Sequence, residues 1–99
     1  MLNSKERAKL RSIASTIDAT SIIGKEGLTK TVLDQISNEL FARELVKVSV
    51  LESAEKSAKE YLHEVANSLG AEEVCSIGRK FVVFKVSNKK GIKHIDLKG

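Results

Sequence analysis

Hydrophobic residues recur at helical spacing in three segments of the chain. The first stripe predicts a helix over residues 4–17. The second predicts a helix over residues 29–42, with Thr29 as its N-cap. The third predicts a helix over residues 53–69, which Gly70 ends because glycine tolerates a positive φ angle.

Shorter segments between these helices follow a two-residue period. Valine alternates with polar residues over 45–50, which predicts a strand with one buried face. A short strand is expected over 21–23, and two more over 73–77 and 81–86, joined by a glycine-containing turn. At the start of the last strand, the residues that point to either face are apolar, so we expect both faces of this strand to be covered.

Helices and strands alternate along the chain in the order α-β-α-β-α-β-β. This order predicts an α/β fold, a compact two-layer sandwich in which a mixed four-stranded sheet packs with helices. With 99 residues the chain is expected to form one domain, residues 1–99, with a basic tail over about 87–99. Within that tail, Ile92, Ile95 and Leu97 could form a short extra strand.

The net charge of +4 is unevenly distributed. Residues 1–30 hold six basic and three acidic side chains, residues 31–75 hold four and nine, and residues 76–99 hold seven and one. If the fold brings the two basic segments to one face and leaves the acids elsewhere, that face is suited to nucleic acid. The alternative is that charged ends serve solubility alone.

Residues that carry catalysis or bind metals are sparse. Cys75 is the single cysteine, which excludes a disulfide framework and a cysteine-based metal cluster. His63 and His94 have no metal-ligand partner at suitable spacing. The sequence therefore argues against an enzyme and predicts no metal or cofactor. It also shows no signal-peptide pattern and no membrane-length apolar run, so we expect a cytoplasmic protein.

The most informative string is Gly24-Lys25-Glu26-Gly27, which lies between the short strand and the second helix. Glycines let backbone N–H groups approach a phosphate closely, and the helix that follows offers the positive end of its dipole. Lys25 and Lys30 add positive charge, whereas Glu26 opposes phosphate binding unless its side chain points away. The alternative is that the glycines serve the geometry of the turn alone.

Aromatic residues suited to base stacking are few. Phe81 and Phe84 fall on opposite faces of the last strand, so they cannot form one stacking platform. A KH domain also differs, because its GxxG loop joins two helices rather than a strand and a helix. Recognition of the backbone and shape of folded RNA suits this composition better than stacking on single strands.

The helix-strand-GxxG-helix order resembles the CRM domain, and more narrowly the bacterial stand-alone YhbY-type proteins, over residues 2–86. The resemblance includes the strings at 44–48 (ELVKV), 69–71 (LGA) and 74–79 (VCSIGR). It implies a fold similar to the C-terminal domain of a bacterial translation initiation factor, RNA binding through the GxxG loop and the adjoining basic surface, and association with precursors of the large ribosomal subunit. Plant relatives of the domain act in group II intron splicing. The chain departs from the family at 84–86, where Phe-Lys-Val replaces Tyr-Arg-Pro.

The predicted partners are RNA, in particular large-subunit ribosomal RNA, and the precursor particle, bound by a monomer. The candidate RNA-binding residues are Gly24, Lys25, Glu26, Gly27, Thr29, Lys30, Lys5, Lys9, Arg11, Arg79, Lys80, Lys85, Lys89 and Lys90. The alternative is a protein-interaction module that docks a basic ribosomal protein through an acidic helical face. That face is predicted to consist of Glu52, Glu55, Glu60 and Glu64.

Overall fold

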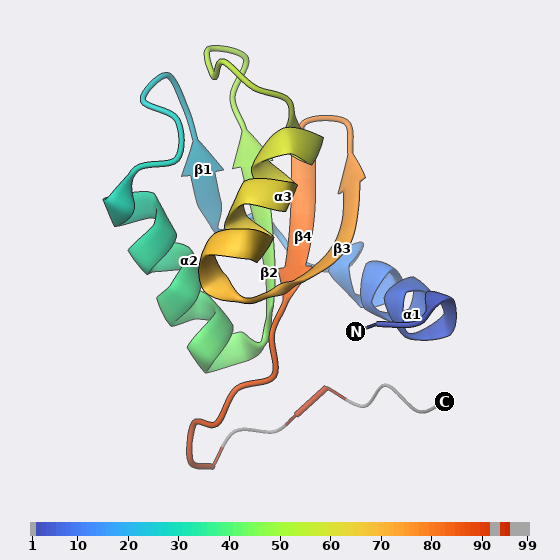
Figure 1. Cartoon of the computed structure of the whole chain (residues 1–99). Coiled ribbons are helices and arrows are strands. Elements are labelled where there is room, and N and C mark those ends of the chain that lie inside the picture. The colour runs from blue at the N-terminus through green and yellow to red at the C-terminus, as the bar shows by residue number, and fades with distance from the viewer. Residues whose placement is uncertain (1, 92–93, 96–99) are drawn as a thin grey trace.

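The computed structural model describes residues 2–91, 94 and 95. Its helices and strands follow the predicted order (Figure 1). In chain order they are α1 (Ser4–Ala14), β1 (Ser21–Ile23), α2 (Lys30–Arg43), β2 (Leu45–Val50), α3 (Ala58–Leu69), β3 (Glu72–Ile77) and β4 (Lys80–Phe84).

The four strands form one mixed sheet in the order β1-β2-β4-β3. β1 runs parallel to β2, and β4 runs antiparallel to both β2 and β3. The β3–β4 pairing contains an irregularity between Glu73 and Cys75. The predicted α/β class and the mixed four-stranded sheet are confirmed.

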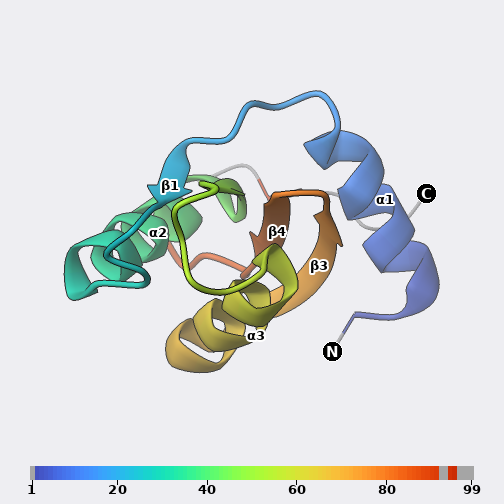
Figure 2. The same cartoon turned by 90° about the horizontal axis from the view of Figure 1, so that it is seen from above.

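Apolar side chains fill both faces of the sheet. On one face, α2 and α3 cover a core that includes Phe81 and Val83, both fully buried. On the other face, α1 inserts Leu10 beside Val82 in a second core. The side chains on the two faces of β4 are both apolar, and each set packs in a different core, as the sequence predicts. Because α1 packs on the face opposite α2 and α3 (Figure 2), the predicted two-layer arrangement gains a partial third layer.

Two helix boundaries differ from prediction. α1 ends at Ala14 rather than at residue 17, because the N–H groups of Thr16 and Ile17 bond three residues back, in a tighter turn than an α-helix. α3 begins at Ala58 rather than at residue 53. Ser57 accepts a hydrogen bond from the Glu60 N–H and the Glu60 carboxylate bonds back to the Ser57 N–H, which forms a capping box.

The segment after β4 is held against the body by Glu44, which is 1% exposed. The Glu44 carboxylate accepts hydrogen bonds from the N–H of Ser87 at 2.6 Å, the N–H of Ile95 at 3.1 Å and Nδ1 of His94 at 2.6 Å. Ile95 also packs against the second core. Ile92 and Leu97, the other members of the predicted extra strand, lie outside the described residues.

Candidate nucleic-acid interface

Three connections meet at one end of the sheet, at the top of Figure 1: β1 to α2, β2 to α3, and the β3–β4 turn. We call this the loop end. The Leu51 N–H donates to the Ile23 carbonyl at 2.8 Å, and the Val50 N–H donates to the Arg79 carbonyl at 2.6 Å. The end of β2 is therefore bonded to both of the other connections, which fixes the three loops relative to one another.

The GxxG loop, residues 24–27, forms a tight turn at the loop end. The Gly27 N–H donates to the Gly24 carbonyl at 2.9 Å, and the Thr29 N–H donates to the Gly27 carbonyl at 3.1 Å. Lys25 and Glu26 occupy the exposed corner of the turn. Within the described part of the chain, their backbone N–H groups donate no hydrogen bond. Two backbone donors are therefore available to an anion at this corner.

The two glycine positions differ in how strictly they require glycine. Gly27 has φ +73°, which glycine adopts without the steric cost that an L-residue would meet. A Cβ atom at Gly24 would lie 3.3 Å from Leu51 Cδ1, a tight contact that a small shift of the Leu51 side chain can relieve. A Cβ atom at Gly27 would lie 3.5 Å from the hydroxyl of the buried Tyr61, so α3 supports the loop from behind.

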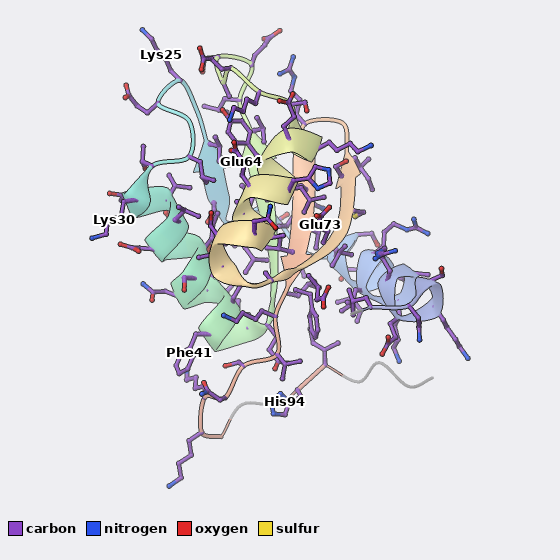
Figure 3. All side chains as sticks on the ribbon, in the orientation of Figure 1. Lys25, Lys30, Phe41, Glu64, Glu73 and His94 are labelled. Carbon is purple, nitrogen blue, oxygen red and sulfur yellow. The ribbon has the colours of Figure 1, made fainter. Side chains whose placement is uncertain are left out.

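Thr29 caps α2 as predicted. Its hydroxyl accepts a hydrogen bond from the Val32 N–H at 3.2 Å, and its backbone is extended. The first turn of α2 contains no acidic residue that would neutralise the positive end of the helix dipole. Lys25 projects from the tip of the GxxG loop, and Lys30 projects from the first turn of α2 (Figure 3).

The predicted RNA-binding residues fall into three separate groups. The GxxG loop, Thr29, Lys30, Arg79 and Lys80 share the loop end. A second group lies on α1, which packs on the face of the sheet opposite α2 and α3. A third group follows the opposite end of β4, where Lys85 donates from Nζ to the Leu69 carbonyl at 2.8 Å. The second group is Lys5, Lys9 and Arg11, and the third is Lys85, Lys89 and Lys90.

The expectation of one basic face with the acids elsewhere is therefore wrong. Lys80 and Lys85 lie at opposite ends of β4. The loop end also contains acids, because Glu26 lies in the GxxG loop and Glu52 lies 3.6 Å from the Arg79 guanidinium. The pair is exposed on both sides, so it contributes little to stability and can exchange for other partners.

The predicted acidic helical face is formed only in part, because two of its four members, Glu55 and Glu64, line a common cavity. Glu52 and Glu55 precede α3 rather than lying on it. Glu60 is engaged in the capping box, and Glu64 pairs with Lys56. The structure thus distributes the four carboxylates over a loop, a helix cap and an ion pair. This arrangement gives no support to the alternative of a docking helix.

Sequence reasoning missed two residues that shape the loop end. Leu51 packs against Gly24, and Tyr61 lies behind Gly27. The pairing of β1 with β2 brings Leu51 to the loop, and the packing of α3 against the sheet brings Tyr61 there. Their positions relative to the glycines in the sequence carry no signal of this contact.

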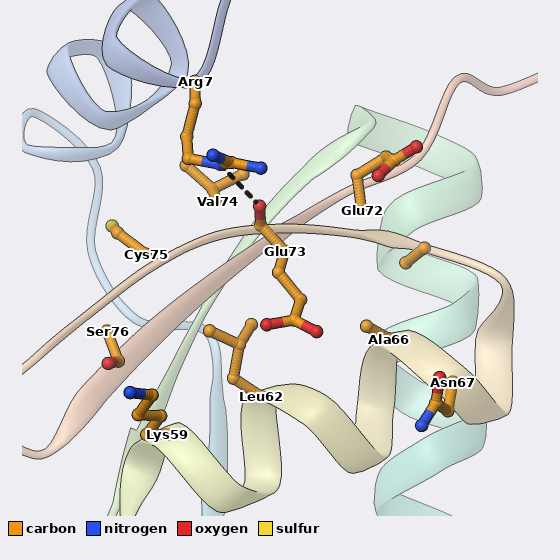
Figure 4. Close-up of a pocket in the computed structure, with 11 residues that line it drawn as sticks. Arg7, Lys59, Leu62, Ala66, Asn67, Glu72, Glu73, Val74, Cys75 and Ser76 are labelled. Atoms are coloured by element: carbon orange, nitrogen blue, oxygen red, sulfur yellow. Dashed lines mark hydrogen bonds between the residues drawn. The ribbon is translucent and has the colours of Figure 1, made fainter. Parts of the chain in front are cut away.

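A cavity of about 530 Å³ lies beside the edge strand β3, between α1 and α3 (Figure 4). Arg7 crosses it and donates from Nε to the Glu73 carbonyl at 3.2 Å. The Glu73 carboxylate bonds to Nδ1 of His63 at 2.8 Å. At this edge of the sheet, Arg7 is therefore bonded to the backbone of β3, and the Glu73 side chain is bonded to α3.

Cys75 lines the same cavity, and burial raises the pKa of its thiol, although the positive charges of Arg11 and Lys47 oppose that rise. The thiol is therefore a poor nucleophile. In residues 2–91, 94 and 95, no group of three or more histidine, cysteine or acidic side chains is placed to hold a metal ion. Over the same residues, none of the helices has the length and apolar character needed to cross a bilayer.

The fold and the loop end define an α/β domain with a glycine loop between a strand and a capped helix, at one end of a mixed sheet. The chain matches the CRS1 / YhbY (CRM) domain over residues 2–85 and belongs to that family. The resemblance predicted from the sequence is confirmed.

Individual relatives span almost the whole chain. A Bacillus subtilis (strain 168) protein named as probable RNA-binding protein YqeI is 33% identical over 97 residues, which are 98% of this chain and 99% of the relative. A Haemophilus influenzae protein named as an RNA-binding protein is 27% identical over 92 residues, 93% of each chain. The solution structure of a hypothetical Staphylococcus aureus protein, described as a candidate RNA-binding protein, has a TM-score of 0.77 and 34% identity. The match covers 91% of this chain and 94% of the Staphylococcus aureus chain.

Proposed function

We propose that this protein binds RNA without catalysing a reaction, through the loop end, and associates with the precursor of the large ribosomal subunit as a monomer in the bacterial cytoplasm. Its membership of the CRM family and the names of its relatives support the RNA-binding part. Neither the family description nor those names denote an enzyme, in agreement with the sequence prediction.

The observation that carries the proposal is the pair of free backbone donors at Lys25 and Glu26. An RNA phosphate at this corner would accept hydrogen bonds from both N–H groups. The start of α2, capped by Thr29, directs the positive end of its dipole to the same region. Glu26 is exposed, so its side chain can point into solvent while its N–H serves the phosphate.

Basic side chains at the loop end would contact neighbouring phosphates. Arg79 lies on the β3–β4 turn, Lys80 begins β4, and Lys30 begins α2. A phosphate can replace Glu52 as the partner of Arg79, because the existing pair is exposed. The basic residues of α1 and those after β4 would be reached only by an RNA that extends past the edges of the sheet.

The salt dependence of binding tests the loop assignment. Replacing Lys25 and Lys30 by glutamine should weaken binding to large-subunit ribosomal RNA. It should also reduce the slope of log affinity against log salt by about 1 to 2, because up to two phosphate contacts are lost. The matched control is Lys89→Gln with Lys90→Gln, which removes the same charge at the far end.

If the two double variants reduce the slope of log affinity against log salt equally, the loop assignment is overturned. RNA would then be held only by a diffuse electrostatic attraction to the protein. Crosslinking in cells, followed by sequencing of the attached RNA, tests the ribosomal part. Enrichment of large-subunit ribosomal RNA is expected. Enrichment of transfer or messenger RNA instead would refute the association with the precursor particle.

A further inference from the structure

Four side chains form a row across all four strands on the sheet face that α1 only partly covers. The register pairs Ile22 with Ser49, Ser49 with Lys80, and Lys80 with Ile77. Because neighbouring strands lie about 4.8 Å apart, the row spans roughly 14 Å from edge to edge. We call Ile22, Ser49, Lys80 and Ile77 the open row.

The open row lies on the α1 side of the sheet. Side chains alternate along a strand, so Lys80 shares a face with Val82 and Ser49 shares one with Lys47. Val82 belongs to the core beneath α1. Lys47 donates from Nζ to the Ala14 carbonyl at the end of α1, at 3.1 Å. Ile22 points the same way, since the next residue, Ile23, is buried in the opposite core.

Three of the four side chains in this row are exposed, and Ser49 is half-buried. Ile22 is 58% exposed and Ile77 is 67% exposed, and Lys80 is exposed between them. Below the row, the connection from α1 to β1 is bonded to β2, where the Thr20 N–H donates to the Lys47 carbonyl at 3.0 Å. Above it lies the loop end, so the row is bounded by the GxxG loop and the β3–β4 turn.

The row is continuous with the proposed phosphate site. Ile22 is separated from Gly24 by one residue, and Lys80 follows Arg79 directly. Leu51, which packs against Gly24, is a third exposed aliphatic side chain at the same end, 45% exposed. Single exposed aliphatic side chains are common on protein surfaces, but here three of them adjoin the proposed phosphate site, which suits a ligand that is partly apolar.

We propose that the open row contacts unpaired bases of the RNA whose backbone the GxxG loop holds. This inference rests on the proposed function and adds to it that the target is single-stranded at the contact. Ile22 and Ile77 would pack against base faces, and Lys80 would bond to a base edge or a phosphate between them. In the RRM fold, aromatic side chains on a four-stranded sheet stack two or three unpaired bases, and in the open row isoleucines would take the place of those aromatics.

A protein partner fits this row less well. A standard protein interface buries about 800 Å² on each side and has an apolar centre. The row is one residue wide, with a lysine between its two isoleucines. Bases supply flat apolar faces beside negative charge, which matches isoleucine beside lysine.

The test uses an unstructured RNA of about 12 nucleotides, alone and annealed to its complement. Wild-type protein should bind the single strand about tenfold more tightly than the duplex. The variant with Ile22→Ser and Ile77→Ser should lose about tenfold affinity for the single strand only. Its salt slope should stay unchanged, because apolar contacts release no counterions.

The control variant is Val86→Ser, which changes an equally exposed aliphatic residue beyond the far end of β4. Thermal melting checks that all variants fold. If the wild-type protein binds neither RNA, the proposed function itself fails. If the wild-type protein binds the single strand and the double variant binds it with the same affinity, the open row does not contact bases. A double variant that keeps RNA affinity but loses self-association or ribosomal-protein binding would also overturn the inference, in favour of a protein contact.

Discussion

Replacing Glu44 by glutamine tests how the segment after β4 is anchored. The Glu44 carboxylate is 1% exposed and accepts hydrogen bonds from Ser87, His94 and Ile95. Glutamine keeps the shape but turns one acceptor oxygen into an NH₂ donor. In either orientation of the amide, a backbone N–H that now donates to Glu44 would face another donor.

The expected loss follows from these bonds. A hydrogen bond to a charged group contributes about 1.5–3 kcal/mol, and a buried donor left unsatisfied costs a similar amount. We therefore expect Glu44→Gln to lower the free energy of unfolding by about 2–4 kcal/mol. In a domain of this size, that loss corresponds to a decrease of roughly 10–25 °C in melting temperature.

The loss should depend on pH. Burial pushes the pKa of the Glu44 carboxyl upward, but the hydrogen bonds from Ser87, His94 and Ile95 outweigh burial and hold that pKa below its ordinary value of 4.5. The native state then binds a proton less readily than the unfolded chain. The stabilisation is fully present above the unfolded pKa and is lost as the pH falls through the lower folded pKa. The difference between wild type and variant should therefore narrow in acid.

Urea denaturation followed by circular dichroism measures both effects, at neutral pH and at about pH 3.5. Glu55→Gln is the matched control, because Glu55 is exposed and lies in the loop before α3. Equal midpoints for wild type and Glu44→Gln at neutral pH would refute the anchoring role. A difference that widens on acidification would contradict the direction given for the Glu44 pKa.

Two further predictions concern local backbone structure, and thermal denaturation checks both. Gly27→Ala should lower the free energy of unfolding by about 1–2 kcal/mol, because residue 27 has φ +73°. Gly24→Ala should change that free energy by less than about 0.5 kcal/mol, because the tip of the Leu51 side chain can shift. Equal losses at the two glycines would contradict the separate reasons given for them. Ser57→Ala should lower the free energy of unfolding by about 1 kcal/mol, whereas Ser57→Asp should retain the N-cap and the stability. Similar stability of the alanine and aspartate variants would show that the capping box does not define the start of α3.

Local patterns predicted the elements well where the hydrophobic period was unambiguous. The alternating valines of β2 gave its bounds, Leu45–Val50, and Thr29 was recognised as the cap of α2. The start of α3 was placed too early because residues 53–57 continue the helical spacing loosely. The pattern of Ser57 followed by Glu60 marked the true start, since it is the sequence signature of a capping box.

Long-range placement could not be derived in the same way. Lys80 and Lys85 are five residues apart and both basic, yet β4 carries them to opposite ends of the sheet. Glu44 was noticed only within a family string, because no local pattern predicts a buried carboxylate with φ +67° that binds residues more than 40 positions later. The sequence therefore could not show that the candidate residues fall into three groups, at the loop end, on α1 and after β4.

The central position of β4 has a consequence for biosynthesis. β4 is the last strand of the described chain, yet it pairs with both β2 and β3 and contributes to both cores. A nascent chain that has emerged only as far as β3 leaves the two strands without the neighbour that joins them, and each core lacks its β4 side chains. Because synthesis runs from the N-terminus, sheet closure must wait for Phe84 to leave the ribosome. Closure of the sheet is therefore coupled to the synthesis of β4 rather than proceeding element by element.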